Sequence, residues 1–196
     1  MKFILASSSP RRRELLTSIG LDFDVVPSHV PEEHQPGEAP EEYVARLSRE
    51  KANAIAAKHP SAWIIAADTT VLLGDQLLEK PVDKKDAERM LSLIAGKTHV
   101  VYTGVTLQNV ERGYRETRVA ESEVRMLPLA LEDVRWYVST GEPLDKAGAY
   151  AVQGIGAMFI DSIHGSYTNV VGLPLAMLFQ MMRKAGIDLL KDKDNV

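Results

Sequence analysis

The chain has 196 residues, of which 45% are hydrophobic, and its formal net charge is −4. This length and composition allow one sizeable folded domain and exclude a disordered chain, while the acidic balance disfavours nucleic-acid binding, which usually needs a basic stripe. The absence of cysteine excludes disulfides, thiolate metal sites and cysteine nucleophiles.

Membrane association is also not expected from the sequence. No apolar run approaches the roughly 20 residues of a membrane helix. The first apolar run ends too early for a signal peptide, because the polar residues 7–13 follow it directly. We therefore expect a cytoplasmic protein with neither a membrane nor a nucleic acid as partner.

The first twenty residues predict a strand that leads into a helix with an unusual first turn. Residues 3–5 are apolar, and Ser9-Pro10 is typical of an N-cap followed by proline at the first helical position. Arginines at positions 11–13 then occupy the first turn, where the helix dipole disfavours each cation by roughly 0.3–1 kcal/mol. Guanidinium groups, serine hydroxyls and free backbone N–H groups together favour a phosphate site. The alternative is a solvated surface turn.

The next elements contain a lysine and an aspartate at noteworthy positions. Residues 29–40 form an acidic, proline-rich loop, and residues 40–58 predict a helix in which Lys51 lies on the inward, apolar face. Lys51 either reaches a cleft or covers the core with its stem. Residues 62–67 predict a buried strand that Asp68 ends. At such strand ends open α/β sheets bind ligands, although a turn-capping role is the alternative.

Helices and strands alternate through the rest of the chain, which indicates a mixed sheet in one layered α/β domain over residues 1–196. Two-residue and three-residue turns at Gly74-Asp75 and near Gly113 predict two hairpins. Further strands are expected over residues 23–26, 70–73, 76–79, 99–110, 114–126, 149–153 and 157–163, and further helices over residues 83–94, 131–139 and from Pro174 onward.

Two motif-like stretches fail on inspection. Residues 96–98 imitate the end of a P-loop, but a strand follows where a helix is required. The histidines of the acidic loop match no familiar zinc spacing. A set of carboxylates and cations remains: Glu32, Asp68, Arg11, Arg12, Lys51 and Lys80. Hard carboxylates suit Mg²⁺ or Mn²⁺, and such a metal with cations suits a triphosphate, so the set indicates phosphoryl or nucleotidyl transfer.

Six motifs, taken together and in order, resemble the Maf family of nucleotide pyrophosphatases. They are ASSSPRR from Ala6, REKA from Arg49, AADT from Ala66, EKP from Glu79, HVVYTGV from His99 and GAYAVQG from Gly148. The resemblance implies metal-dependent hydrolysis of nucleoside triphosphates to monophosphate and pyrophosphate. It also implies an elongated mixed β-sheet flanked by helices, with an active cleft between two lobes, as in the ITPase/Maf-like fold, and a homodimer.

The resemblance assigns roles position by position. Asp68 matches the proton acceptor, and Glu32 with Asp68 would hold the metal. Proline at position 31 departs from the usual aspartate of the family's loop, so Glu33 stays an alternative to Glu32. The remaining assignments are Arg12, Lys51 and Lys80 as catalytic and phosphate-binding cations, Ser7 and Ser9 as phosphate-binding hydroxyls, and Arg11, Thr69 and Gln153 as determinants of base selection.

The segment 165–174, with Thr69 and Gln153, resembles the branch of the family that acts on dTTP and UTP, whereas the other main branch prefers 7-methyl-GTP. A glutamine amide can donate and accept, which permits pairing with a pyrimidine edge. A competing hypothesis is a non-catalytic regulator of septum formation. Trp136 and Tyr137 would then form a partner surface, although such residues on a helix more often pack inward.

Overall fold

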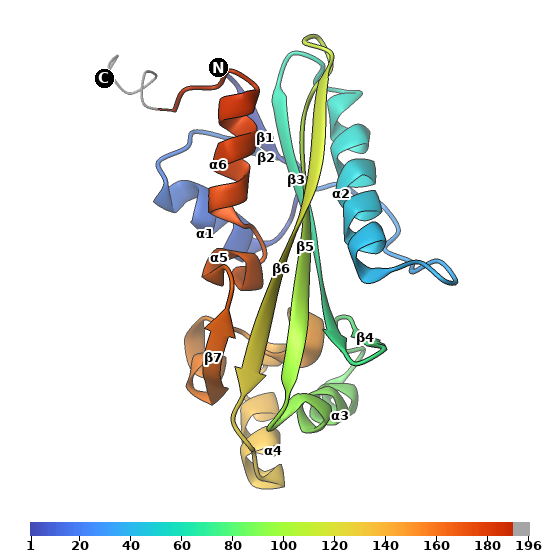
Figure 1. Ribbon diagram of the computed structural model, residues 1–196, viewed down its shortest axis with the longest axis vertical. Helices are drawn as coiled ribbons and strands as arrows, with labels where there is room; N and C mark the ends of the chain where they lie inside the picture. The colour runs from blue at the N-terminus through green and yellow to red at the C-terminus, as the bar shows by residue number, and fades with distance from the viewer. Residues whose placement is uncertain (190–196) are drawn as a thin grey trace. The chain divides into compact units, whose positions relative to one another are not determined.

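The computed structural model describes residues 1–189 and shows a mixed α/β fold (Figure 1). Its seven-stranded sheet has the order β2-β1-β3-β5-β6-β7, and β4 pairs with β3. β1 (Phe3–Leu5) is parallel to β2 (Asp24–Val25) and to β3 (Trp63–Leu73), whereas β4 (Gln76–Leu78) is antiparallel to β3. The predicted mixed sheet flanked by helices is confirmed.

The chain forms two compact units, and β3, β5 (Thr98–Asn109) and β6 (Tyr114–Met126) contribute residues to both. Of the described residues, unit 1 contains 1–68, 103–120 and 172–189, and unit 2 contains 69–102 and 121–171. A single domain over residues 1–196 and an active cleft between two lobes stay predictions; residues 190–196 lie outside the described part.

Among residues 1–189, unit 1 contains three helices: α1 (Pro10–Ser18), α2 (Pro40–Ala56) and α6 (Leu175–Lys184). In Figure 1, α2 lies on one side of the long strands, and α1 and α6 lie on the other. Small side chains let α2 approach the sheet closely, and a Cβ at Gly104 of β5 would lie 2.3 Å from the Val44 carbonyl oxygen. The core at this contact consists of Ile4, Ala6, Ala52, Ile55, Ala56, Ala62, Ile64 and Ala66.

Unit 2 packs two helices beside the other halves of the long strands. α3 (Lys84–Ile94) begins at Asp83, whose Oδ1 accepts a hydrogen bond from the Asp86 N–H at 2.7 Å, as the cap prediction requires. α4 (Leu131–Ser139) has the bounds that the sequence predicts. The unit also contains β7 (Ile160–His164), α5 (Tyr167–Val171) and 3-10 turns over Glu142–Asp145, Ala147–Ala149 and Gly154–Phe159.

Three sequence predictions are wrong. Asp68 does not end a strand, because β3 continues to Leu73 and joins the two strands expected over residues 62–73. Residues 149–153 are not a strand, since Gly148 and Ala149 have positive φ angles of 71° and 58°. The strand expected over residues 157–163 begins at Ile160, after a 3-10 turn. α5 was not expected, because five residues are too few for a helical period.

None of the helices formed by residues 1–189 has the length and hydropathy that a membrane crossing requires.

A buried histidine lies in the core of unit 2. His99 is 1% exposed, and its Nε2 lies 2.8 Å from the hydroxyl oxygen of Tyr150. The two rings meet edge to face, with centroids 5.2 Å apart. Burial lowers the pKa of His99 to about 4, so the imidazole is neutral at pH 7.

We expect this histidine to make stability depend on pH. The folded pKa lies below the ordinary value of 6.5, so the unfolded chain binds the proton first as pH falls from 6.5 toward 4. Stability should therefore drop by roughly 2 kcal/mol between pH 7 and pH 4.5 through this group. Urea unfolding at both pH values, with His99→Gln beside wild type, measures the contribution. His164→Gln, at an exposed position, is the matched control; equal pH slopes in wild type and His99→Gln would contradict the expectation.

Candidate active site

Two carboxylates in unit 1 converge on the ammonium of Lys51. Lys51 projects from α2, and its Nζ lies 2.6 Å from Asp68 Oδ1 and 2.5 Å from Glu32 Oε1. Lys51 and Asp68 are buried, whereas the Glu32 side chain is 42% exposed. The inward orientation predicted for Lys51 is confirmed. The cluster is open to solvent on the side where Glu32 lies.

Burial makes this cluster interdependent. Moving a charged group out of water costs several kcal/mol even after relaxation, so a buried lysine requires close opposite charges. Asp68 supplies one from β3, and Glu32 supplies the other from the acidic loop. Lys51 in turn allows two carboxylates to lie close together without strong mutual repulsion.

Arg12 joins the cluster from the first turn of α1. Ser9 caps the helix, and its Oγ accepts from the Arg12 backbone N–H at 3.5 Å. The Arg12 guanidinium donates to Ser7 Oγ at 3.2 Å and, through Nε, to the Gly172 carbonyl at 2.8 Å. Burial lowers the pKa of Arg12, while the carboxylates of the cluster act in the opposite direction. The arginine and serine side chains that the sequence predicts at this turn therefore lie in contact with one another.

Arg46 fastens the acidic loop to α2. Its guanidinium binds Glu38 through two bonds, Nε to Oε1 at 2.6 Å and Nη2 to Oε2 at 2.7 Å, and Nη2 also donates to the Glu33 carbonyl at 2.9 Å. Nη1 contacts Glu50 at 3.3 Å. The ring of Tyr43 lies under the guanidinium, 5.6 Å from its centre. A bidentate fork of this kind fixes orientation as well as distance.

This attachment distinguishes the two glutamates that the sequence left open. Glu32 directs its carboxylate to Lys51, and its backbone carbonyl accepts from the Tyr43 hydroxyl at 3.4 Å. Glu33 contacts Arg46 through its backbone carbonyl. The geometry therefore favours Glu32 as the loop carboxylate of the site.

The remaining predicted site residues are distributed over both units. Arg11 is half-buried in α1, next to Arg12. Unit 2 contains Thr69, which follows Asp68 in β3, Lys80 after β4, and Gln153 before the 3-10 turn over Gly154–Phe159. The cluster assembled in unit 1 thus consists of Ser7, Ser9, Arg12, Glu32, Lys51 and Asp68.

The donor atoms of the cluster fit a hard divalent cation. Two carboxylate oxygens lie within 2.6 Å of one nitrogen, so they face the same small volume. Within residues 1–189 no group of three or more His, Cys, Asp or Glu side chains could hold a metal by itself. Mg²⁺ usually binds through one or two carboxylates, with substrate phosphates and water completing its shell. Glu32 and Asp68 match that pattern, and the side chains of the cluster contain no soft ligand.

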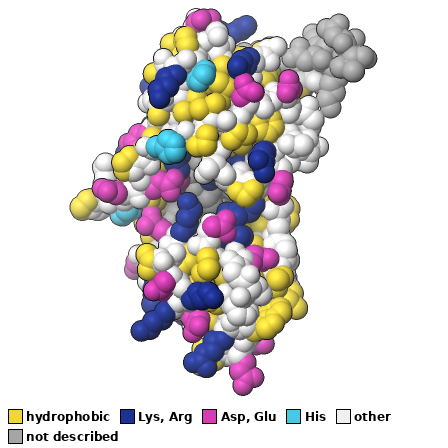
Figure 2. All heavy atoms as spheres, turned by 180° about the vertical axis from the view of Figure 1, so that it is seen from behind, with side chains coloured by type: hydrophobic (Ala, Val, Ile, Leu, Met, Phe, Trp, Pro, Cys, Tyr) yellow, Lys and Arg dark blue, Asp and Glu magenta, His cyan; other side chains and the backbone are white. Residues whose placement is uncertain are grey.

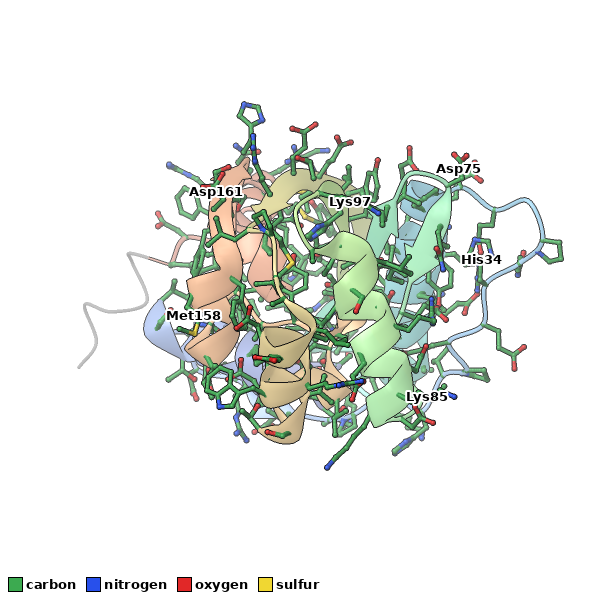
Figure 3. All side chains as sticks on the ribbon, turned by 90° about the horizontal axis from the view of Figure 1, so that it is seen from below. His34, Asp75, Lys85, Lys97, Met158 and Asp161 are labelled. Atoms are coloured by element: carbon green, nitrogen blue, oxygen red, sulfur yellow. The ribbon has the colours of Figure 1, made fainter. Side chains whose placement is uncertain are left out.

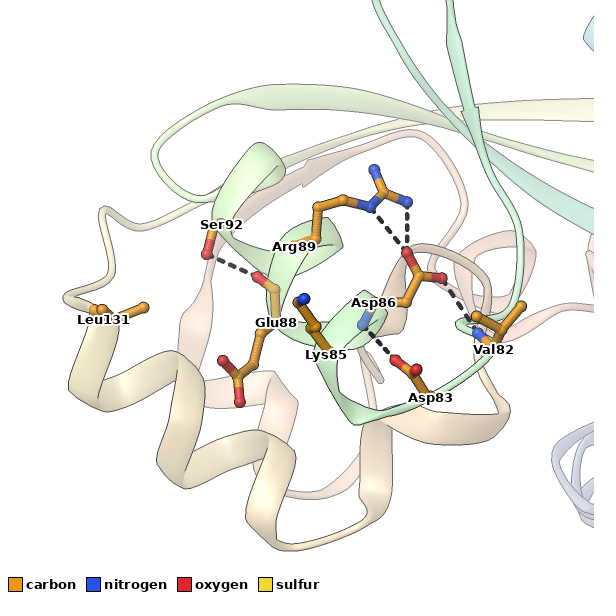
Figure 4. A pocket seen from close by; sticks show the side chains of 8 residues that line it. All are labelled: Val82, Asp83, Lys85, Asp86, Glu88, Arg89, Ser92 and Leu131. Atoms are coloured by element: carbon orange, nitrogen blue, oxygen red, sulfur yellow. Dashed lines mark hydrogen bonds and ion pairs between the residues drawn. The ribbon is translucent and has the colours of Figure 1, made fainter.

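A separate cavity of about 540 Å³ lies beside α3 in unit 2 (Figure 4). None of the predicted site residues lines it. Asp86 accepts from Arg89 and from the Val82 backbone N–H, so these two charged side chains pair with each other. The lining residues are Val82, Asp83, Lys85, Asp86, Glu88, Arg89, Ser92 and Leu131.

Lys97, in the P-loop-like stretch, lies exposed in the turn between α3 and β5 and projects from the ribbon in Figure 3. On the face in Figure 2, Lys and Arg side chains are interspersed with Asp and Glu. Of the two aromatic residues considered as a partner surface, Tyr137 is fully buried and Trp136 is 52% exposed.

Comparisons of the sequence with known proteins show the family of this chain. A family model described as "Maf-like protein" matches residues 2–185. The "dTTP/UTP pyrophosphatase" of Myxococcus xanthus (strain DK1622) is 48% identical over 95% of this chain and 93% of its own. The protein of the same name from Syntrophus aciditrophicus (strain SB) is 48% identical over 94% of this chain and 90% of its own length. A solved HAM1 protein from Coxiella burnetii aligns with a TM-score of 0.46 at 11% identity, covering 94% and 99%.

We expect Arg46→Gln to release the acidic loop. The variant removes the bidentate bond to Glu38, and such charged hydrogen bonds contribute roughly 1.5–3 kcal/mol each. Hydrogen exchange in residues 33–38 should accelerate by about tenfold or more. Exchange followed by mass spectrometry measures this. Arg89→Gln, which removes an exposed fork to Asp86 on α3, is the control; unchanged exchange in Arg46→Gln would show that the loop is held by other contacts.

Proposed function

Because this chain belongs to the Maf-like protein family, we propose that it hydrolyses dTTP and UTP to the nucleoside monophosphate and pyrophosphate. The observation that carries the proposal is the cluster in which Lys51 contacts both Asp68 and Glu32, with Arg12 beside them. It combines cations for phosphate oxygens with a buried carboxylate for proton transfer. The named relatives supply the substrate class.

In the proposed reaction, water attacks the α-phosphorus, and the bond from that phosphorus to the bridging oxygen of pyrophosphate breaks. Asp68 accepts the proton of the attacking water, since a positioned carboxylate can act as general base. Arg12 and Lys51 stabilise the charge that develops on the phosphate oxygens, because fixed cations act strongly in a water-poor site. Lys51 also fixes the position of the Asp68 carboxylate, because its ammonium contacts Oδ1 at 2.6 Å.

A divalent cation, Mg²⁺ or Mn²⁺, is part of the proposal. Glu32 and Asp68 would hold it, and when bound it would neutralise charge on the triphosphate oxygens. Arg46 keeps the loop that carries Glu32 against α2, so the carboxylate would not need to be ordered at each turnover.

Base selection is assigned to Arg11, Thr69 and Gln153 by the family resemblance, and Lys80 is assigned as a third phosphate-handling cation. Within residues 1–189 the side chain of Gln153 forms no hydrogen bond, so its amide is available to a ligand. An amide donor and acceptor match the carbonyl and N–H edge of uracil and thymine. These roles, a homodimer and a cytoplasmic location stay predictions.

The function is tested by pyrophosphate release from a panel of dTTP, UTP, CTP, dCTP, ATP, GTP and 7-methyl-GTP, with Mg²⁺ or Mn²⁺ and with chelator. We expect metal-dependent release from dTTP and UTP, because of the family and the hard donor set. A preference for 7-methyl-GTP would keep the chemistry and overturn the base assignment. No release from any nucleotide would favour the non-catalytic regulator of septum formation.

The role of Asp68 predicts the behaviour of Asp68→Asn. The variant keeps the size of the side chain but cannot accept the proton, so turnover should fall by roughly 10²–10⁴-fold. Nucleotide binding, measured by calorimetry with a non-hydrolysable analogue, should weaken far less. Asp75→Asn, in the exposed turn between β3 and β4, is the matched control and should leave turnover unchanged. Turnover retained in Asp68→Asn would rule out the general-base role.

A further inference from the structure

Glu142 lies at the centre of a hydrogen-bonded group in unit 2 that the proposed chemistry does not use. Its Oε1 accepts from the Gly156 N–H at 2.9 Å and from the Tyr137 hydroxyl at 2.8 Å, and its Oε2 accepts from the Ile155 N–H at 3.0 Å. Burial raises the pKa of Glu142, but these hydrogen bonds outweigh it and hold the pKa below its usual value. The carboxylate therefore stays ionised and keeps all three donors.

Tyr137 extends the group to the other side of the same segment. Its hydroxyl accepts from the Ala151 N–H at 3.1 Å while it donates to Glu142. The ring is fully buried in α4 and packs edge to face on Phe159, with centroids 5.3 Å apart. The backbone is thus held at residue 151 and again at residues 155 and 156.

The two glycines of the segment make room for these groups. A Cβ at Gly154 would lie 2.5 Å from Glu142 Oε2, and Gly154 has a φ of 75°, which favours glycine. A Cβ at Gly156 would lie 2.4 Å from the Tyr137 hydroxyl oxygen. The sequence Gly154-Ile155-Gly156, which resembles an incomplete dinucleotide motif, is therefore required for close approach of Glu142 and Tyr137.

Gln153 is the residue between the two points of attachment. It is half-buried and precedes the 3-10 turn, and no partner within residues 1–189 fixes its side chain. The position of its amide is therefore set by the backbone on either side of it. A displacement of the order of 1 Å is enough to weaken a hydrogen bond to a ligand substantially.

We propose that Glu142 and Tyr137 are positioning residues for base selection, because together they hold the backbone of residues 151–156 and so place the amide of Gln153. This inference rests on the proposed function, in which Gln153 contacts the base. Neither residue needs to touch the nucleotide. Their removal should alter discrimination between bases more than it alters phosphate chemistry, which depends on the cluster of unit 1.

Tyr137→Phe is the first test, because it removes only the hydroxyl and keeps the ring that packs on Phe159. The ratio of kcat/KM for UTP to kcat/KM for CTP should fall by about tenfold, mainly through loss with UTP. Glu142→Gln, which replaces one acceptor oxygen by a donor, should lower the same ratio. Tyr114→Phe is the matched control, since Tyr114 donates a comparable bond to Glu116 at 2.6 Å in unit 1.

A double-mutant cycle separates positioning from a general structural effect. Gln153→Ala should lower the ratio by itself, and Tyr137→Phe added to it should lower the ratio no further. Amide exchange at Ala151, Ile155 and Gly156 should accelerate by about tenfold in Tyr137→Phe and Glu142→Gln, as expected for local opening. This readout does not depend on turnover.

The outcomes distinguish the inference from the function on which it rests. A wild-type protein without any preference for UTP over CTP would overturn the base-selecting role of Gln153 and this inference with it. A wild-type preference that survives unchanged in Tyr137→Phe and Glu142→Gln would overturn the positioning role alone. Additive effects of Tyr137→Phe and Gln153→Ala on the ratio would overturn it as well.

Discussion

The buried ammonium of Lys51 is the constraint on which the candidate site depends. A lysine inside unit 1 is tolerated only because Asp68 and Glu32 contact it, and each of these carboxylates comes from a different element. The strand β3, the helix α2 and the acidic loop must therefore hold their mutual positions for the charges to remain compensated. Removing one partner would leave an uncompensated charge, which is far more costly than replacing the whole cluster by apolar groups. Stability and chemistry are thus linked through the same three side chains.

The surrounding contacts can be understood as support for that arrangement. Alanine side chains and Gly104 bring α2 close to the sheet, which places Lys51 within reach of Asp68. Arg46 binds the loop to the same helix, so Glu32 and Lys51 are supported by one element. Ser9 begins α1 at the point where Arg12 can reach Ser7 and the Gly172 carbonyl. The unfavourable arginine in the first turn is offset because the two carboxylates lie beside it.

Local periodicity in the sequence was sufficient to predict much of the fold and the inward orientation of Lys51. Contacts that cross irregular segments could not be predicted from the sequence. The four-residue spacing of Leu47, Lys51 and Ile55 indicated the inward lysine, since a helix repeats on that period. The contact of Arg46 with Glu38 spans a loop without any period, so no sequence pattern indicates it. The strand expected over residues 149–153 was wrong because backbone conformation at Gly148 and Ala149, with positive φ, overrides the apolar alternation around them. The group formed by Tyr137 and Glu142 binds the irregular backbone at residues 151, 155 and 156, so no sequence period indicates it.

The two units of the chain would meet two different requirements of the proposed reaction, hydrolysis and selection of the base. In the proposed function, hydrolysis uses charges at fixed distances, and unit 1 would supply them through ion pairs that join helix, strand and loop. In the proposed function, discrimination between bases uses a neutral donor and acceptor at a fixed position, and Gln153 of unit 2 would supply both from a backbone segment held by Glu142 and Tyr137. The boundary between the units falls within β3, directly after Asp68. The two units have separate packed cores, so under the proposed function substitutions around Gln153 would change the preferred base while the charged cluster is retained.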